Sequence, residues 1–228
     1  MENETRPVRA VIYDMDGVII DSEPVYKAIE MGFYNELGIT LTQERLIGSI
    51  GRSALEWWTE IGEEFALDID PQELTDRENQ AYQDFLDDPE RIKPLIPDFP
   101  ETVRKLSDRN IKIGVASGSA KNSIGKVLRL ADPDGIVDAW ISAEDEIVEN
   151  GKPAPDVFLH AAALLGVAPE DCVVVEDSAN GILAARNAGM RTVGFHGASD
   201  TGQDTSAADY VVSSHLELTA LPLFTQAQ

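Results

Sequence analysis

The chain has 228 residues, 43% of them hydrophobic, and its 41 acidic and 18 basic residues give a net charge of −23 at pH 7. Its length suits one large domain or a core with a smaller insert. Its acidity argues against nucleic acid or an anionic membrane as a partner, because both need basic patches. No stretch approaches the roughly 18 apolar residues that a membrane span needs. We therefore expect a cytoplasmic protein; the sequence does not indicate an oligomeric state, and a monomer is the default expectation.

The strong negative charge has two interpretations. One is a salt-rich cytoplasm, since at about 1 M salt the Debye length is only about 3 Å and surface charge no longer repels an anionic substrate. The other is an ordinary acidic cytosolic protein. The single cysteine, Cys172, lies in an apolar run, so we expect a buried thiol and a reducing compartment.

The first expected strand covers residues 8–13 and is followed at once by two carboxylates, Asp14 and Asp16. Like charges this close raise a pKa or demand a cation between them. The pair indicates a metal site, an acid/base pair, or a nucleophile with its proton carrier. A calcium loop of the EF-hand type is disfavoured, because the positions that need Gly and Glu are Ile19 and Val25.

Residues 21–91 show helical patterns and no convincing strand. An apolar stripe at helical spacing begins at Val25, and further helices are expected over 53–65 and 71–86. Proline-containing turns at both ends resemble hinges. The pattern predicts an all-helical cap domain, either a static layer or a mobile lid. The core would then comprise residues 1–20 and 92–228.

The rest of the chain alternates short β-rich apolar runs with helix-like segments. Nearly continuous apolar runs are typical of parallel strands that are buried on both faces. The alternation predicts an α/β fold with a Rossmann-like open parallel sheet. The later strands are expected at 111–116, 139–141, 172–175, 191–195 and 210–212, and the helices at 100–109, 121–130, 155–165 and 181–188.

Chemistry-bearing residues follow these strands, where open α/β sheets bind their ligands. Ser117 and Gly118 follow the second strand, Glu176 and Asp177 follow the fourth, and Lys152 precedes a helix. Acids can hold Mg²⁺, while hydroxyls, helix amides and a lysine can hold phosphoryl oxygens. Each residue alone has an ordinary explanation, such as a helix cap or a surface lysine. Their order and placement together indicate phosphoryl chemistry.

At four motifs the chain resembles the haloacid dehalogenase (HAD) superfamily of hydrolases, and in particular its β-phosphoglucomutase-like phosphatase branch. The resemblance covers nearly the whole chain, including the helical cap. The motifs are Asp14-Met15-Asp16-Gly17-Val18-Ile19-Ile20-Asp21-Ser22, Ala116-Ser117-Gly118-Ser119, Gly151-Lys152-Pro153-Ala154-Pro155-Asp156 and Val175-Glu176-Asp177-Ser178.

The resemblance implies a role for each of these positions. Asp14 would be the nucleophile that forms an aspartyl-phosphate. Asp16 would protonate the leaving group and then activate water. The implied Mg²⁺ ligands are Asp14, Asp16, Asp177 and Glu176, and the implied phosphate-binding residues are Ser117, Gly118 and Lys152.

Within the superfamily, a phosphatase acting on a small phosphorylated metabolite, such as a sugar phosphate, fits best. Dehalogenases lack the second aspartate, and phosphonoacetaldehyde hydrolases use a cap lysine, which is missing between Lys27 and Lys93. A phosphomutase remains the alternative, although β-phosphoglucomutase has a histidine at the position of Tyr26. A silent protein that only binds Mg²⁺ and phosphate is a third possibility.

The cap carries candidates for substrate contact. Gly51 and Arg52 resemble the family's substrate-specificity loop, and Arg52 suits a polar or anionic leaving group. Trp57 and Trp58 could line a pocket, but neighbours on a helix do not share a face, so one of them is expected to pack in a core.

Overall fold

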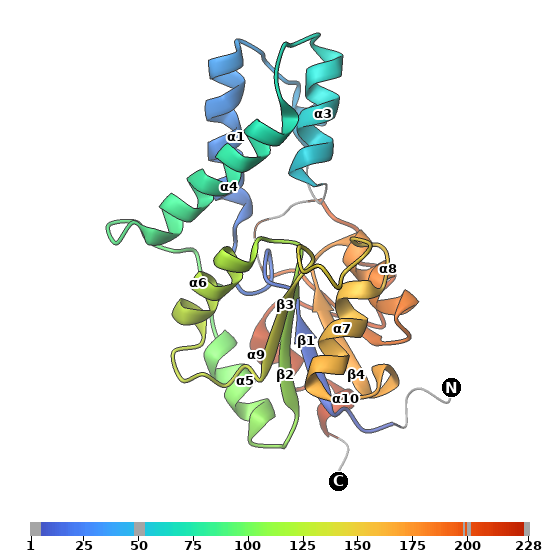
Figure 1. The fold of residues 1–228 in the computed structure, drawn as a ribbon. Helices are drawn as coiled ribbons and strands as arrows, with labels where there is room; N and C mark the ends of the chain where they lie inside the picture. Colours follow the sequence, from blue (N-terminus) through green and yellow to red (C-terminus); the bar gives the residue numbers. More distant parts are fainter. Residues whose placement is uncertain (1–5, 48–52, 198, 200–201, 226–228) are drawn as a thin grey trace. The chain divides into compact units, whose positions relative to one another are not determined.

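The computed structural model describes residues 6–47, 53–197, 199 and 202–225. The chain forms two compact units (Figure 1). The first, here called the core unit, joins Met1–Asp21 to Pro94–Gln228. The second, the helical unit, is Ser22–Lys93. Among the described residues, no helix is long and apolar enough to cross a membrane.

The described part of the core unit contains a six-stranded parallel sheet in the order β3-β2-β1-β4-β5-β6. Ala10 of β1 lies between Lys112 of β2 and Cys172 of β4. The strand order therefore reverses at β1, which is where such sheets bind ligands. The predicted parallel α/β fold is confirmed. The strands are β1 (Ala10–Tyr13), β2 (Lys112–Ser117), β3 (Ala139–Ser142), β4 (Cys172–Glu176), β5 (Arg191–Phe195) and β6 (Tyr210–Val212).

Side chains of β1 alternate between two buried faces, as the period of a strand requires. Ala10 and Ile12 belong to an apolar cluster with α7 (Asp156–Leu165) and α8 (Ala179–Asn187). Tyr13 packs instead against Phe99 of α5 (Phe99–Ser107) and His215 of α9 (His215–Leu218). Figure 1 shows α7 in front of the sheet and α9 behind it. The other helices in the described part of the unit are α6 (Lys121–Ala131), η2 (Pro169–Asp171) and α10 (Pro222–Thr225).

The strands and the longer helices of this unit begin and end within two residues of the predicted positions. The short helices α9 and α10 were not predicted, because four residues are too few to show a helical period. Cys172 is buried as expected, and burial raises the pKa of its thiol to about 12.

The helical unit contains α1 (Glu23–Leu37), α2 (Gln43–Ile47), α3 (Ala54–Glu64) and α4 (Pro71–Asp87), so the predicted all-helical insert is confirmed. Two of these helices have side-chain N-caps. Ser53 caps α3 by accepting a hydrogen bond from the backbone N–H of Glu56, and Asp70 caps α4 by accepting one from the backbone N–H of Gln72.

Both tryptophans of α3 are buried in the helical unit, where one of them was expected to pack in a core. The Trp57 indole N–H donates to the Tyr34 hydroxyl at 2.8 Å, and that of Trp58 donates to Glu78 at 2.6 Å. Because each buried N–H has a partner, neither ring needs a solvent-facing edge. The idea that the two rings line a pocket together is therefore not supported.

The two chain connections to the helical unit lie next to each other in the core unit. Ile20 and Leu95 form an antiparallel bridge, and the Asp21 N–H donates to the Pro94 carbonyl at 2.8 Å. Within the core unit, the chain before the insert and the chain after it are therefore joined side by side, as though the insert were one long loop between β1 and α5.

Candidate functional site

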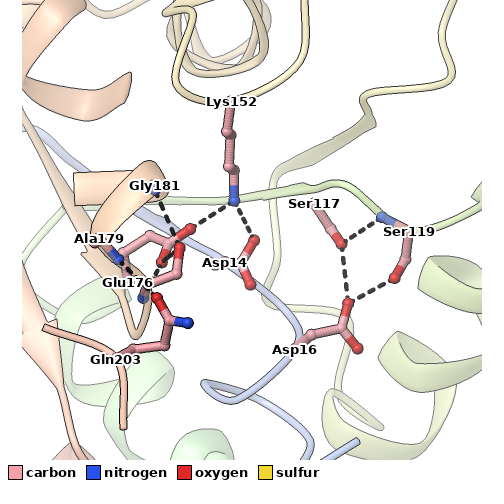
Figure 2. A network of polar contacts seen from close by, with 10 residues as sticks. Asp14, Asp16, Ser117, Ser119, Lys152, Glu176, Ala179, Gly181 and Gln203 are labelled. Atoms are coloured by element: carbon pink, nitrogen blue, oxygen red, sulfur yellow. Dashed lines mark hydrogen bonds and ion pairs between the residues drawn. The ribbon is translucent and has the colours of Figure 1, made fainter. Parts of the chain in front are cut away.

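Three segments that are distant in the sequence bring opposite charges together beyond the end of β1. Lys152 Nζ lies 2.6 Å from Asp14 Oδ1 and 2.7 Å from Glu176 Oε1 (Figure 2). Asp14 is held in place by its own N–H, which donates to the Val175 carbonyl of β4 at 2.9 Å. Asp14 is 5% exposed and Glu176 only 1%, so these charges interact where little water screens them.

Glu176 is fixed by the start of α8 as well as by Lys152. Its Oε2 accepts hydrogen bonds from the backbone N–H of Ser178 at 2.6 Å and from the Ser178 hydroxyl at 2.8 Å. The same hydroxyl accepts from the Gly181 N–H, which caps the helix. A Cβ at position 181 would lie 1.7 Å from Glu176 Oε1. Residue 181 must therefore be a glycine for the glutamate to keep this position.

Asp16 is held by two serines from the loop after β2. Its Oδ2 accepts from the Ser119 hydroxyl at 2.6 Å and from the Ser117 hydroxyl at 3.4 Å (Figure 2). The Ser119 N–H in turn donates to Ser117 Oγ at 3.0 Å. Gly118 lies between them and is exposed. The sequence singled out Ser117 and Gly118 but gave no role to Ser119. The signal available was a second hydroxyl in the same loop.

Burial and neighbouring charges raise the pKa of two acids in this cluster, Asp14 and Asp177. Desolvation raises the pKa of Asp14 to about 7, with Glu176 and Asp16 adding to the rise and Lys152 opposing it. Burial, and then the charges of Glu176 and Asp14, raise the pKa of Asp177 well above its usual range. Burial by itself would lower the pKa of Lys152, but the two carboxylates beside it raise that pKa. One ammonium for four carboxyl groups leaves an excess of negative charge.

The donor set suits Mg²⁺, even though the described residues offer no group of three or more His, Cys, Asp or Glu side chains arranged to hold a metal ion. Mg²⁺ keeps several waters and is commonly bound through one or two carboxylates together with substrate phosphate. Asp16 Oδ1 is buried without a hydrogen-bond partner. The Asp177 carboxylate fills the space that a Cβ of Gly17 would take. These residues therefore fit a cation that they share with a bound phosphate.

The structure thus brings six of the predicted site residues to one edge of the sheet, around the ends of β1, β2 and β4. They are Asp14, Asp16, Ser117, Lys152, Glu176 and Asp177. The two predicted cap residues, Gly51 and Arg52, lie outside the described residues.

Comparison with known proteins identifies the family. The model of the haloacid dehalogenase-like hydrolases matches residues 8–189, which include all four motifs. The chain belongs to the haloacid dehalogenase-like hydrolases. The predicted superfamily and the predicted enzyme class, a hydrolase, are thereby confirmed.

Relatives of this HAD-like hydrolase carry different activities in their names. A β-phosphoglucomutase of Bacillus subtilis is 35% identical over 220 residues, covering 93% of this chain and 92% of that protein. Hexitol phosphatase B of Escherichia coli is 32% identical over 222 residues, covering 96% and 97%. The crystal structure of a β-phosphoglucomutase from Clostridium difficile has a TM-score of 0.76 and 27% identity, covering 92% of this chain and 93% of that one.

Proposed function

We propose that this protein is an Mg²⁺-dependent phosphatase that hydrolyses a small phosphorylated metabolite, such as a sugar phosphate, through an aspartyl-phosphate on Asp14. The observation that carries the proposal is the pairing of a buried Asp14 with Lys152 Nζ at 2.6 Å, beside a second aspartate that two serines hold. A silent binding protein would not need both carboxylates and a lysine at such electrostatic cost.

The proposed reaction has two displacements at phosphorus. In the first, a carboxylate oxygen of Asp14 forms a bond to phosphorus while the bond to the leaving oxygen breaks, and Asp16 gives that oxygen its proton. In the second, water attacks phosphorus, Asp16 takes a proton from the water, and the bond to Asp14 breaks. The products are the free alcohol and inorganic phosphate, and Asp16 ends in its starting protonation state.

Lys152 and the loop after β2 would hold the phosphoryl group during both steps. Lys152 supplies a positive charge beside Asp14, and Ser117 and the backbone at Gly118 supply hydrogen bonds to phosphoryl oxygens. Because Lys152 contacts Oδ1 of Asp14, the other carboxylate oxygen is the one we assign to attack.

Asp14, Asp177 and the backbone carbonyl of Asp16 would hold Mg²⁺, which supplies further positive charge for the phosphoryl oxygens. The oxygens of Glu176 are already engaged by Lys152 and Ser178. We therefore propose that Glu176 acts mainly by orienting Lys152 and reaches the ion at most through a water molecule.

The helical unit would serve as the cap domain, which the sequence pattern places at residues 21–91. Gly51 and Arg52 of this domain would contact the leaving group. Its insertion directly after the turn that carries Asp14 and Asp16 supports this role. A closing cap would limit the access of water and align the substrate. For partners and compartment we propose a cytoplasmic monomer whose acidic surface suits a high salt concentration.

A β-phosphoglucomutase-type activity is the second candidate, because the Bacillus subtilis relative of that name is 35% identical over 93% of this chain. The tyrosine at position 26 and the phosphatase names of other relatives favour hydrolysis. The two activities differ in product. With β-glucose 1-phosphate, a mutase yields glucose 6-phosphate, whereas a phosphatase yields free phosphate.

The test is turnover of p-nitrophenyl phosphate with Mg²⁺, followed by a panel of phosphorylated metabolites at low and high salt. Asp14→Asn should lose activity by about 1000-fold or more, as expected for removal of a nucleophile, while remaining folded. Asp108→Asn removes an equal charge from an exposed position and should leave turnover unchanged. Near-normal turnover by Asp14→Asn would exclude the covalent route.

A further inference from the structure

His215 is a fully buried histidine on the far side of the sheet from α7. Its ring packs against Phe195 at a centroid distance of 4.7 Å, Phe99 at 5.4 Å and Tyr13 at 5.9 Å. It makes one directional contact: Nε2 lies 2.8 Å from the carbonyl oxygen of Val18. A carbonyl oxygen can only accept, so the ring nitrogen Nε2 must carry the proton and donate.

Burying a histidine in this aromatic cluster costs folding free energy. With the proton on Nε2, Nδ1 is a bare acceptor, and it is buried without a hydrogen-bond partner. Leaving a buried polar group unpaired destabilises the folded state, because the group loses its hydrogen bonds to water. Burial also lowers the pKa of His215 to about 4, so the ring is neutral near pH 7. A phenylalanine would fill the same space without this cost, and what it would lose is the bond to Val18.

The Val18 carbonyl belongs to the turn Met15–Ile20 that follows the proposed nucleophile. Inside the turn, the N–H groups of Ile19 and Ile20 donate to the Met15 carbonyl at 2.8 and 3.1 Å, and the Gly17 N–H donates to the Ile20 carbonyl at 2.8 Å. The carbonyls of Val18 and Ile19 instead accept hydrogen bonds from residues of the core unit outside the turn. That of Ile19 accepts from the Ile96 N–H at 2.8 Å, and that of Val18 accepts from His215.

We infer that His215 is a positioning residue: its Nε2–H fixes the Val18 carbonyl and thereby the turn that sets Asp16 relative to Asp14. The inference rests on the proposed function for the part that concerns catalysis. The contacts of His215 are with the Val18 carbonyl and three aromatic rings, and not with the carboxylates of Asp14 or Asp16. It acts through two backbone positions, from Val18 to Asp16. Small displacements of such a group are costly, because a shift of about 1 Å can lower a rate by about 100-fold.

The test compares His215→Phe, which keeps the aromatic ring without its donor, with His215→Gln, whose amide N–H can reach Val18. Phe99→Leu is the matched control, because it disturbs the same aromatic cluster and leaves the hydrogen bond in place. His215→Phe should lower kcat on p-nitrophenyl phosphate by between about 10- and 100-fold with little change in KM. His215→Gln should recover most of kcat, and Phe99→Leu should lower Tm while keeping kcat.

Amide hydrogen exchange tests the anchor without relying on activity. In His215→Phe the amides of Ile19 and Ile20 should exchange at least about tenfold faster, while those of β4 keep their protection. Equal kcat and equal exchange in His215→Phe and the wild type would overturn the inference, as would failure of His215→Gln to restore either. If His215→Phe does not fold, His215→Leu takes its place. A wild type without any phosphatase activity would refute the proposed function, and the exchange experiment would still decide on the anchor.

Discussion

The carboxylate of Asp177 lies where residue 17 would place a side chain: a Cβ there would be 1.9 Å from Asp177 Oδ2. Gly17 also has a φ of +72°, which disfavours any residue with a Cβ. Two demands therefore meet at Gly17, a left-handed backbone and a close approach of a carboxylate. Only the second concerns the proposed metal site.

Gly17→Ala should displace Asp177 and raise the Mg²⁺ concentration needed for half-maximal activity by about tenfold or more, in the range known for disturbed metal sites. Gly135→Ala is the matched control, because Gly135 has a φ of +67° and nothing within 4 Å of its missing Cβ. It should cost stability alone, by about 1 kcal/mol. Equal Mg²⁺ dependence in both variants would contradict a metal role for Asp177. The measurement is a Mg²⁺ titration of turnover beside a melting curve.

Lys152→Met should both abolish turnover and destabilise the fold, because it leaves Asp14 and Glu176 buried without a cation. Breaking a buried ion pair typically costs about 3–5 kcal/mol. The loss should be smaller at pH 5.5 than at pH 8, since the Asp14 carboxyl group, whose pKa is raised to about 7, is then protonated. Urea unfolding at both pH values measures it.

Two further variants test whether unpaired charge explains the loss of stability in Lys152→Met. Adding Glu176→Gln to Lys152→Met should recover part of the stability and none of the activity. Lys121→Met removes an exposed ammonium that pairs with Asp145 and should change unfolding little. A loss of stability for Lys152→Met that is the same at both pH values would speak against the charge explanation.

Glu30→Gln should stabilise the protein at pH 8 and have little effect at pH 5. The Glu30 carboxyl group accepts from the Tyr34 hydroxyl at 2.8 Å, and burial, with added repulsion from Glu78 and Glu23, raises its pKa to about 7. Because the folded state holds the proton more tightly than the unfolded state, stability from this group is present below its unfolded pKa and is lost as pH rises through about 7. A glutamine keeps the hydrogen bond without the charge.

The expected gain at pH 8 is on the order of 3 kcal/mol, since the pKa rises from 4.5 to about 7 and each pKa unit corresponds to about 1.4 kcal/mol. Thermal unfolding across pH 5–8 measures the effect, with the exposed Glu44→Gln as the charge-matched control. If the gain in stability does not grow with pH, ionisation of Glu30 does not destabilise the folded state.

Added salt should raise the stability of this protein strongly, because the net charge of −23 makes the folded state repel itself. At about 1 M salt the Debye length falls to about 3 Å, which removes most repulsion between surface charges. We expect Tm and turnover both to rise between 0.1 and 2 M KCl, and a non-ionic osmolyte at the same osmolality to do less. Full stability and activity in dilute buffer would reject the adaptation to high salt.

The central strands β1 and β4 could be predicted from the sequence because they are buried on both faces and so appear as nearly unbroken apolar runs. The carboxylates of Asp14 and Asp16 could be predicted as site residues from their place after such a run. Other features depend on distant pairings that no local pattern encodes. Nothing near Glu176 indicates that Lys152, 24 residues earlier in the chain, would occupy one of its oxygens. Likewise His215, in a helix of four residues, meets Val18 only through the fold.

The hydrogen bond from the Asp21 N–H to the Pro94 carbonyl has a consequence for how such proteins diversify. The helical unit leaves and rejoins the core unit at two neighbouring points that the core itself pairs. A different insert could replace Ser22–Lys93 as one cassette, provided that its two ends lie equally close. The segments that carry Asp14, Lys152 and Asp177 would not be interrupted by such an exchange. If the proposed substrate contacts lie in this insert, reaction and substrate choice can be inherited, and engineered, as separate traits of one chain.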